Sequence, residues 1–404
     1  MDLYSGLPYW IVKNDLYDYF NPLTKNHRTD VAIIGSGITG ALVAHELCKA
    51  GIGCTIIDKR TPATGSSATS TALLQYEIDE PLYKMAESVG EDKALLAYRS
   101  CLQSITDIEN VFKDIGINPD FERVPSVFYA SNRKGRRIIE KEYEIRKKHN
   151  LPVTLLKGKE VRDMYGFKAP CALMNTESAQ IDAYLAAVTI LNHHKKRKEL
   201  ELYTHTEITK CEKKSGGYEL LSENRFTINC KYVVIAAGFE AGKFLPEKVM
   251  ELTSTYALIS EPVPASSIWK GRSLIWETKE PYIYIRTTKN NRIIVGGEDE
   301  EFKDPVKRDK LLRKKTEKLE KKFRKFFPAI PFKTDMAWCG TFSSTDDGLP
   351  YIGQWRGKEG MFFALGYGGN GITFSMSAAQ MIRNTIEGKD DERYSVFGFE
   401  RDNK

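Results

Sequence analysis

The chain has 404 residues, of which 41% are hydrophobic and 28% are charged, values that are ordinary for a globular protein. This length exceeds what one hydrophobic core usually organises, so we expect two domains. The net charge of +6 comes from 60 basic and 54 acidic residues. Such a near balance favours solvated surface over a dedicated nucleic-acid-binding face.

The cysteines and histidines offer no metal or disulfide framework. The seven cysteines are scattered and form no C-x-x-C pair, and the six histidines are dispersed. This usage predicts free thiols in a reducing compartment and no metal site. No apolar run approaches the roughly 18 residues of a membrane span. Residues 1–10 lack the features of a secretory signal, so we expect a cytoplasmic protein.

The N-terminal third opens with aromatic residues and then a strand–helix–strand unit. Residues 1–28 are rich in aromatic side chains, which predicts an arm packed on the body. The unit that follows has an apolar strand, a helix and a second strand that ends on Asp58. These three elements are predicted at residues 31–34, 41–50 and 54–57. Between the first strand and the helix, the spacing G-x-G-x-x-G places Gly35, Gly37 and Gly40.

This unit predicts a dinucleotide site. The first glycine permits a tight turn, the second lets the backbone approach a pyrophosphate, and the third lets helix and strand pack closely. The helix N-terminus faces the phosphates. Asp58 would accept a hydrogen bond from a ribose 2′-hydroxyl, which disfavours NADP. The motif alone does not separate NAD from FAD.

Several elements of the middle region bear on this site. The Ser/Thr-rich residues 64–74 are interpreted equally well as a helix-capping loop or as a second loop against the ligand. Residues 81–115 have helical periodicity. Residues 231–238 form a buried strand that ends in small residues, as ligand-binding sheet edges do. Residues 282–296 predict a hairpin that turns at residues 290–291.

The last third has a basic helix and a second glycine loop. Residues 307–327 predict a helix whose apolar stripe packs inward while lysines solvate the outer face; binding of nucleic acid is the less favoured interpretation. Further on, a strand at residues 361–365 leads into glycine-rich residues 366–373 and a helix at 374–387. This geometry directs backbone N–H groups at an anion or a carbonyl.

Taken in order, these motifs resemble those of the FAD-dependent amine and amino-acid oxidoreductases, the superfamily of D-amino-acid oxidase, glycine oxidase and sarcosine oxidase. The residues that carry the resemblance are 30–40 with Asp58, 64–74, 233–238, 346–353 and 366–373. The N-terminal Pro8-Tyr9-Trp10 is most similar to the γ-glutamylputrescine oxidase branch.

The resemblance implies an α/β fold with mixed α+β character. A Rossmann-like FAD-binding domain would accompany a second, antiparallel-sheet substrate domain. The FAD-binding domain would be discontinuous and comprise residues 1–75, 150–245 and 333–404. The substrate domain would comprise residues 76–149 and 246–332.

The resemblance also implies an extended FAD. The first glycine turn would meet its pyrophosphate, and Asp58 and Lys59 its adenosine ribose. Ile208 would lie on the adenine side, Gly238 near the ribityl chain, and the second glycine loop around the flavin ring. The implied cofactor-binding residues are Gly35, Gly37, Ile38, Thr39, Gly40, Asp58, Lys59, Ser66, Ser67, Thr71, Ile208, Ala237, Gly238, Gly368, Gly369, Asn370, Gly371, Ile372 and Thr373.

The implied reaction passes a hydride from a carbon that bears an amine to the flavin, which gives an imine that water hydrolyses. The sequence shows no acid–base triad, and no catalytic side chain is identified. Arg286 would bind the substrate beside Tyr282 and Tyr284, with anchoring of the hairpin as its alternative role; Tyr367 is a further candidate. The acceptor of the electrons, O2 or another molecule, stays open, and with it the choice between oxidase and dehydrogenase.

Departures from the family pattern affect the expected substrate. Phe342 and Gly369 stand where glycine oxidase has arginines that hold the substrate carboxylate, which favours an amine over a small amino acid. Ile294 matches a lysine that assists oxygen in sarcosine oxidases. Cys339 falls near the cysteine that bonds flavin covalently there, although most relatives have a small residue and we expect noncovalent FAD.

Two other functions remain as alternatives. An NAD-dependent Rossmann dehydrogenase would explain the first glycine motif but not the second glycine loop at residues 366–373. A tRNA-modifying flavin oxidase is suggested by the net charge and by the basic helix at residues 307–327.

Overall fold

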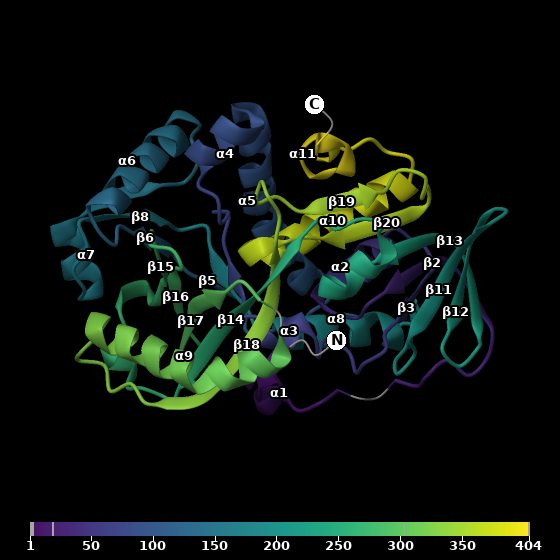
Figure 1. The fold of residues 1–404 in the computed structure, drawn as a ribbon, viewed down its shortest axis with the longest axis horizontal. Helices are drawn as coiled ribbons and strands as arrows, with labels where there is room; N and C mark the ends of the chain where they lie inside the picture. The colour runs from purple at the N-terminus through teal and green to yellow at the C-terminus, as the bar shows by residue number, and fades with distance from the viewer. Residues whose placement is uncertain (1–3, 18–19, 303, 403–404) are drawn as a thin grey trace.

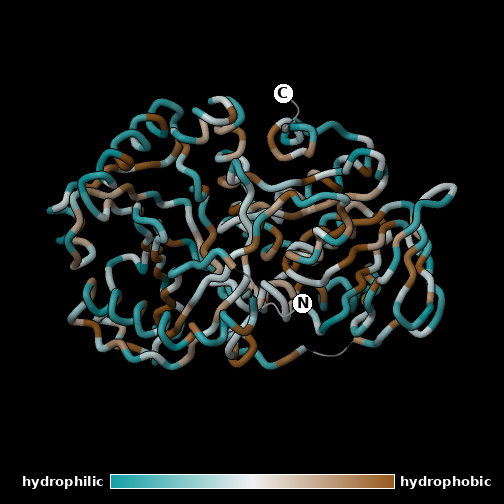
Figure 2. Tube along the Cα trace, viewed as in Figure 1, coloured by the Kyte–Doolittle hydropathy of each residue, from teal (hydrophilic) through white to brown (hydrophobic). Residues whose placement is uncertain are grey.

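The computed structural model describes residues 4–17, 20–302 and 304–402. Two lobes lie side by side, one around an eight-stranded sheet and the other around a nine-stranded sheet (Figure 1). Apolar segments concentrate in the strands and in the helices next to them, whereas the outer helices alternate between polar and apolar residues (Figure 2). A small third sheet joins β4 (Leu73–Leu74), β9 (Ala179–Gln180) and β5 (Glu122–Arg123).

The eight-stranded sheet has a parallel centre. Its strands are β10 (Leu200–Tyr203), β3 (Cys54–Ile57), β2 (His27–Ile34), β13 (Thr227–Ile235), β12 (Gly217–Ser222), β11 (Ile208–Lys214), β19 (Tyr351–Gln354) and β20 (Met361–Leu365). β10, β3, β2, β13 and β20 run parallel, in that order. The apolar run at residues 31–34 is buried, as expected of a strand covered on both faces.

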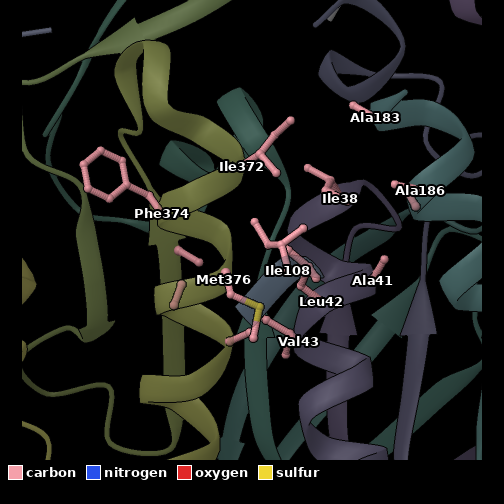
Figure 3. Close-up of a cluster of buried hydrophobic side chains, with 14 of the residues drawn as sticks. Ile38, Ala41, Leu42, Val43, Ile108, Ala183, Ala186, Ile372, Phe374 and Met376 are labelled. Atoms are coloured by element: carbon pink, nitrogen blue, oxygen red, sulfur yellow. The ribbon is translucent and has the colours of Figure 1, made fainter. Parts of the chain in front are cut away.

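Helices α2 (Ile38–Lys49), α5 (Glu91–Asp114), α8 (Ala183–Lys196) and α10 (Gly371–Ile386) form the apolar layer around the glycine turn. Figure 3 shows side chains of α2 and α10 facing each other, among them Leu42, Val43 and Met376. Ala41 and Ala186 are fully buried, because small side chains let α2 approach α8 closely. The predicted helix at residues 81–115 is two helices, α4 (Leu82–Val89) and α5, since Gly90 has a φ of +93°.

The nine-stranded sheet is antiparallel except where β6 pairs with β15. In order, its strands are β1 (Tyr4–Gly6), β18 (Thr334–Ser344), β14 (Glu251–Ser260), β17 (Ile293–Glu300), β16 (Ile283–Thr287), β15 (Leu274–Glu277), β6 (Ser126–Tyr129), β8 (Cys171–Asn175) and β7 (Thr154–Lys157). The hairpin predicted at residues 282–296 is confirmed, with Thr287 opposite Ile293. The predicted domain boundaries at 150 and 333 cut across this sheet, because β7, β8 and β18 belong to it.

The basic helix α9 (Pro305–Phe326) lies against this sheet, as Figure 1 shows. Leu319 and Phe323 are fully buried beneath it. Lys315 and Lys322 pair with Glu298. The inward-packing interpretation of the stripe is therefore confirmed.

The N-terminal arm is held against the body by several contacts among the described residues. β1 pairs with β18 at the edge of the nine-stranded sheet, and Trp10 of α1 (Tyr9–Asn14) is 1% exposed and donates to Ser70 O at 2.7 Å. The other helices are α3 (Ser66–Thr69), α6 (Arg133–Lys148), α7 (Gly158–Tyr165) and α11 (Tyr394–Phe397), with 3-10 turns η1 (Gly238–Phe244), η2 (Ala265–Ser267), η3 (Lys270–Arg272), η4 (Gly368–Asn370) and η5 (Phe399–Asp402). Within the described ranges, none of the helices is long and apolar enough to cross a membrane.

The third glycine of the fingerprint gives a test of the packing. A Cβ at Gly40 would lie 1.9 Å from Gly35 O, whereas a Cβ at Gly37 would meet only Ser67 Oγ at 3.2 Å. We expect Gly40→Ala to lower the free energy of unfolding by about 3 kcal/mol or more, because α2 must move off β2. Gly37→Ala, the matched control, should cost about 1 kcal/mol or less in urea unfolding of the cofactor-free protein. Equal losses in the two variants would contradict this packing.

Candidate functional site

A cavity of about 330 Å³ lies at the carboxyl edge of the parallel strands. The residues that follow β2, β3, β13 and β20 all line it, in order Gly35, Asp58, Ala236 and Gly366. Ligands of open α/β sheets bind at this edge. The nine-stranded sheet and the Ser/Thr-rich loop supply the remaining walls.

The first glycine turn forms one wall of the cavity. Gly35 has a φ of +112°, and a Cβ there would lie 2.3 Å from Ala236 O, so only glycine fits between β2 and β13. Gly37 faces the cavity directly. Gly40 does not line it; a Cβ there would lie 1.9 Å from Gly35 O, so this glycine allows α2 to pack on the turn. The Ser67 hydroxyl accepts a hydrogen bond of 2.9 Å from Ile38 N at the start of α2.

The acidic end of β3 is held by hydrogen bonds. The Asp58 carboxylate accepts from Ser36 N and Ser36 Oγ, both at 2.7 Å, and from Arg60 N at 2.9 Å. Beside it, Lys59 and Arg60 pair with Glu240 of η1 at 2.8 and 2.9 Å. Burial opposes the charge of Glu240, but these two cations lower its pKa to about 2. The sequence analysis missed Arg60 and Glu240, because nothing in the sequence brings residues 180 positions apart together.

The second glycine loop closes the opposite end. The side-chain amide of Asn370 donates to Gln75 O at 3.0 Å and to Glu77 O at 2.8 Å. Gly369 N donates to Asp79 Oδ2 at 2.7 Å. These bonds tie the C-terminal loop to residues 75–79. Thr373 is buried behind the loop and donates to Asn370 O at 2.9 Å, so it does not line the cavity.

The structure brings most of the expected cofactor residues to one cavity, although they come from five separate segments. Those that line it are Gly35, Gly37, Ile38, Thr39, Asp58, Lys59, Ser66, Ser67, Thr71, Ile208, Ala237, Gly238, Gly368, Gly369, Asn370, Gly371 and Ile372. Their roles toward a bound cofactor remain predictions.

The expected substrate residues divide into two groups. Tyr282, Tyr284 and Tyr367 line the cavity near the second glycine loop. Arg286 does not: it is 2% exposed, and its Nη1 donates to the carbonyls of Thr71, Ala72 and Ile181 at 2.8, 2.9 and 2.8 Å. Burial lowers its pKa to about 10. The structure therefore gives Arg286 the anchoring role, because its donors are used on backbone carbonyls.

Two aspartates at this end were missed from the sequence. Asp79 accepts from Tyr282 Oη at 3.0 Å in addition to Gly369 N. Asp299 of β17 lines the same end, and burial raises its pKa to about 6. Of the positions that depart from the family pattern, Phe342 lines the cavity, whereas Ile294 is 1% exposed in the hydrophobic core.

Cys339 is fully buried on β18 and does not line the cavity, although its neighbour Gly340 does. Burial raises the pKa of its thiol to about 12. In the described ranges, no group of three or more His, Cys, Asp or Glu side chains is placed to hold a metal ion.

A model of the FAD-dependent oxidoreductase family matches residues 30–385. The chain belongs to this family. Membership identifies the protein as a flavin enzyme and excludes the NAD-dependent dehydrogenase as its class.

This FAD-dependent oxidoreductase is similar to several relatives and solved structures over nearly its whole length. It is 23% identical to the probable oxidoreductase OrdL of Haemophilus influenzae, over 94% of this chain and 87% of the relative. It is 24% identical to glycine oxidase of Geobacillus kaustophilus, over 90% and 94%. The solved glycine oxidase from that organism superposes with a TM-score of 0.77 at 21% identity, covering 92% of this chain and 98% of that one. L-proline dehydrogenase from P. horikoshii gives 0.77 at 18% identity, covering 93% and 98%. The fold prediction, a Rossmann-like FAD-binding part with a largely antiparallel second sheet, is confirmed.

The cavity fits an extended FAD by its own features. Backbone without side chains faces it at both ends, since a Cβ at Gly238 or Gly371 would meet nothing closer than 3.8 Å. A helix N-terminus and a carboxylate lie at one end, as a pyrophosphate and a ribose require. At the other end, Ile372 and Tyr367 offer apolar surface beside the glycine loop.

Removal of the buried guanidinium tests the role of Arg286. We expect Arg286→Met to lower the free energy of unfolding by about 3 kcal/mol, because three carbonyls lose their donor. Arg99→Met removes an exposed arginine and should change the free energy of unfolding by about 0.5 kcal/mol or less. The KM for substrate should not change in Arg286→Met. Unchanged stability with a raised KM would instead indicate that Arg286 binds the substrate.

The position of Cys339 predicts noncovalent FAD. The thiol is buried and protonated, so it neither reaches the cavity nor supplies a thiolate. After acid precipitation of the holoenzyme, all flavin absorbance should stay in the supernatant. Flavin retained in the pellet, and released by Cys339→Ala, would contradict this prediction.

Proposed function

We propose that the enzyme oxidises a C–N bond of an amine or amino acid by hydride transfer to FAD and thereby produces an imine. The observation that carries the proposal is the single cavity that joins the turn at residues 35–37 to the loop at residues 368–371. Relatives named glycine oxidase and L-proline dehydrogenase act on such bonds, which supports the same chemistry here.

When bound, the flavin would supply the acceptor for the hydride, which carries both electrons. The substrate carbon loses the hydride and the nitrogen loses a proton to solvent, which balances the formation of the C=N bond. Water then hydrolyses the imine to a carbonyl compound and free amine.

The chain supplies position and shielding. Asn370 holds the glycine loop against residues 75–77 and so fixes the surface on which the ring would rest. Trp276, Tyr282 and Tyr284 form an aromatic wall beside it, with ring centroids 6.3 and 5.9 Å apart. Such a wall excludes water from the reacting carbon. Gly35, Gly37 and Asp58 would hold the pyrophosphate and ribose at the far end.

The cellular context and the acceptor are also proposals. All seven cysteines are free thiols, which supports a reducing compartment such as the cytoplasm. Either O2 or another molecule would reoxidise the flavin. A role in tRNA modification is not favoured, because the stripe of α9 that suggested it is packed against the nine-stranded sheet.

Anaerobic titration of FAD-reconstituted protein tests the function. We expect at least one compound from a panel of amines, N-methyl amino acids and D-amino acids to bleach the flavin, and air to restore its colour if O2 is the acceptor. A flavin that dithionite bleaches but that no panel member reduces would overturn the proposal.

A further inference from the structure

A second cavity of about 240 Å³ adjoins the first. The two share Asp79, Trp276 and Tyr282, together with Gly366 and Gly368 of the second glycine loop. Asp79 and its two aromatic neighbours therefore form the partition between an inner space at the flavin end and an outer space. A ligand longer than the inner space would extend across this partition.

Both spaces are acidic, although the whole chain carries a net charge of +6. The flavin end of the first cavity is lined by Glu77, Asp79 and Asp299. The outer cavity adds Glu80, Glu277, Glu280 and Asp346. Against these, Lys84 is the one cation among the lining residues of the outer cavity, and it pairs with Glu80 at 3.4 Å.

The other lining cations lie at the opposite end. Lys59, Arg60 and Lys243 all pair with Glu240 at the ribose end of the first cavity. No Lys, Arg or His lines the flavin end within the described part of the chain. A substrate carboxylate would meet only like charge there, which disfavours its binding.

Asp79 at the partition is accessible from both cavities and has no cationic partner among the described residues. Burial raises the pKa of this carboxyl, whereas the hydrogen bonds from Gly369 N and Tyr282 Oη favour the anion. These bonds fix the carboxylate and leave it without charge compensation. A cation that enters here gains the missing partner.

The surroundings of Asp79 suit an ammonium group. Trp276 stands edge-on to Tyr282 at 6.3 Å and stacks on Phe128 at 3.9 Å. Aromatic side chains beside a carboxylate can pack on the carbon chain of an alkylammonium, and any ring face left open attracts its charge. Metal ions, in contrast, prefer a cage of oxygen ligands.

Buried oxygens without partners point to the same ligand. Glu77 is 4% exposed and lines the inner space, and its Oε2 has no hydrogen-bond partner among the described residues. Its other oxygen, Oε1, lies 3.4 Å from the guanidinium of Arg146. The same guanidinium also pairs with Glu142 at 2.7 Å. Asp299 Oδ1 likewise has no partner within the described ranges. The charge of Lys315 on α9 lowers the pKa of Asp299. The same ammonium pairs with Glu298 and Glu300.

We propose that the substrate is a linear diamine or polyamine cation, one ammonium of which is held by Asp79 beside Trp276 and Tyr282. The C–N bond to be oxidised then lies in the inner space toward the second glycine loop, and any further ammonium lies in the acidic outer cavity. This inference rests on the proposed function and narrows its substrate.

Three probes with the same five-carbon chain test the charge preference in anaerobic flavin reduction. The last carbon carries a second ammonium in cadaverine, is a methyl group in pentylamine and is the carboxylate carbon in δ-aminovalerate. We expect the half-saturating concentration to be lowest for cadaverine, about tenfold or more below that of pentylamine, and highest for δ-aminovalerate.

Variants assign the preference to residues. Asp79→Asn should raise the half-saturating concentration of cadaverine by about tenfold or more. The ratio of the half-saturating concentrations of cadaverine and δ-aminovalerate should then move toward one. Asp299→Asn should move the ratio in the same direction if Asp79→Asn fails to fold. Asp163→Asn removes an exposed carboxylate of α7 and should leave the ratio unchanged.

The outcomes separate the two proposals. Flavin reduction by glycine or N-methylglycine but not by cadaverine would overturn the diamine proposal and leave C–N oxidation in place. An unchanged ratio in both aspartate variants would also overturn it. No reduction by any amine or amino acid would overturn the proposed function itself.

Discussion

The site depends on the parallel pairing of β13 between β2 and β20. Val233 of β13 lies beside Ala32 on one side and Met361 on the other, and Ile235 lies beside Ile34 and Phe363. This register ends three strands at one edge, although they come from distant parts of the chain. Each strand is followed by small residues, so that backbone and not side chains faces the cavity. Without this parallel pairing, the two glycine loops would not face one common cavity.

Hydrogen bonds at the flavin end of the cavity fix the positions of the loops that surround this edge of the sheet. The second glycine loop is tied by Asn370 and Gly369 to residues 75–79, which follow the Ser/Thr-rich loop. Arg286 ties the same loop to the nine-stranded sheet through Thr71 and Ala72. The two lobes are thus joined where the flavin and its substrate would meet. Asp79 is held there by Gly369 of the glycine loop and by Tyr282 of the nine-stranded-sheet lobe.

The cofactor end could be predicted from the sequence because its geometry is local. Gly35, Gly37 and Asp58 lie on one strand–helix–strand unit whose turn admits few residue types. The substrate end could not, since Asp79 and Asp299 are ordinary acids until the sheet brings them to one cavity. Arg286 shows the opposite error: an arginine among tyrosines suggests an anion site, but its hydrogen bonds satisfy buried carbonyls. Burial and pairing, not residue type, decide such roles.

The central claim is that one cavity holds FAD from the first glycine turn to the second. Crystals of the FAD-reconstituted protein test it most directly. We expect continuous density with the pyrophosphate at residues 35–37, the adenosine ribose at Asp58 and the flavin ring against residues 368–371. FAD that lies elsewhere, or a ring turned away from the second glycine loop, would contradict it.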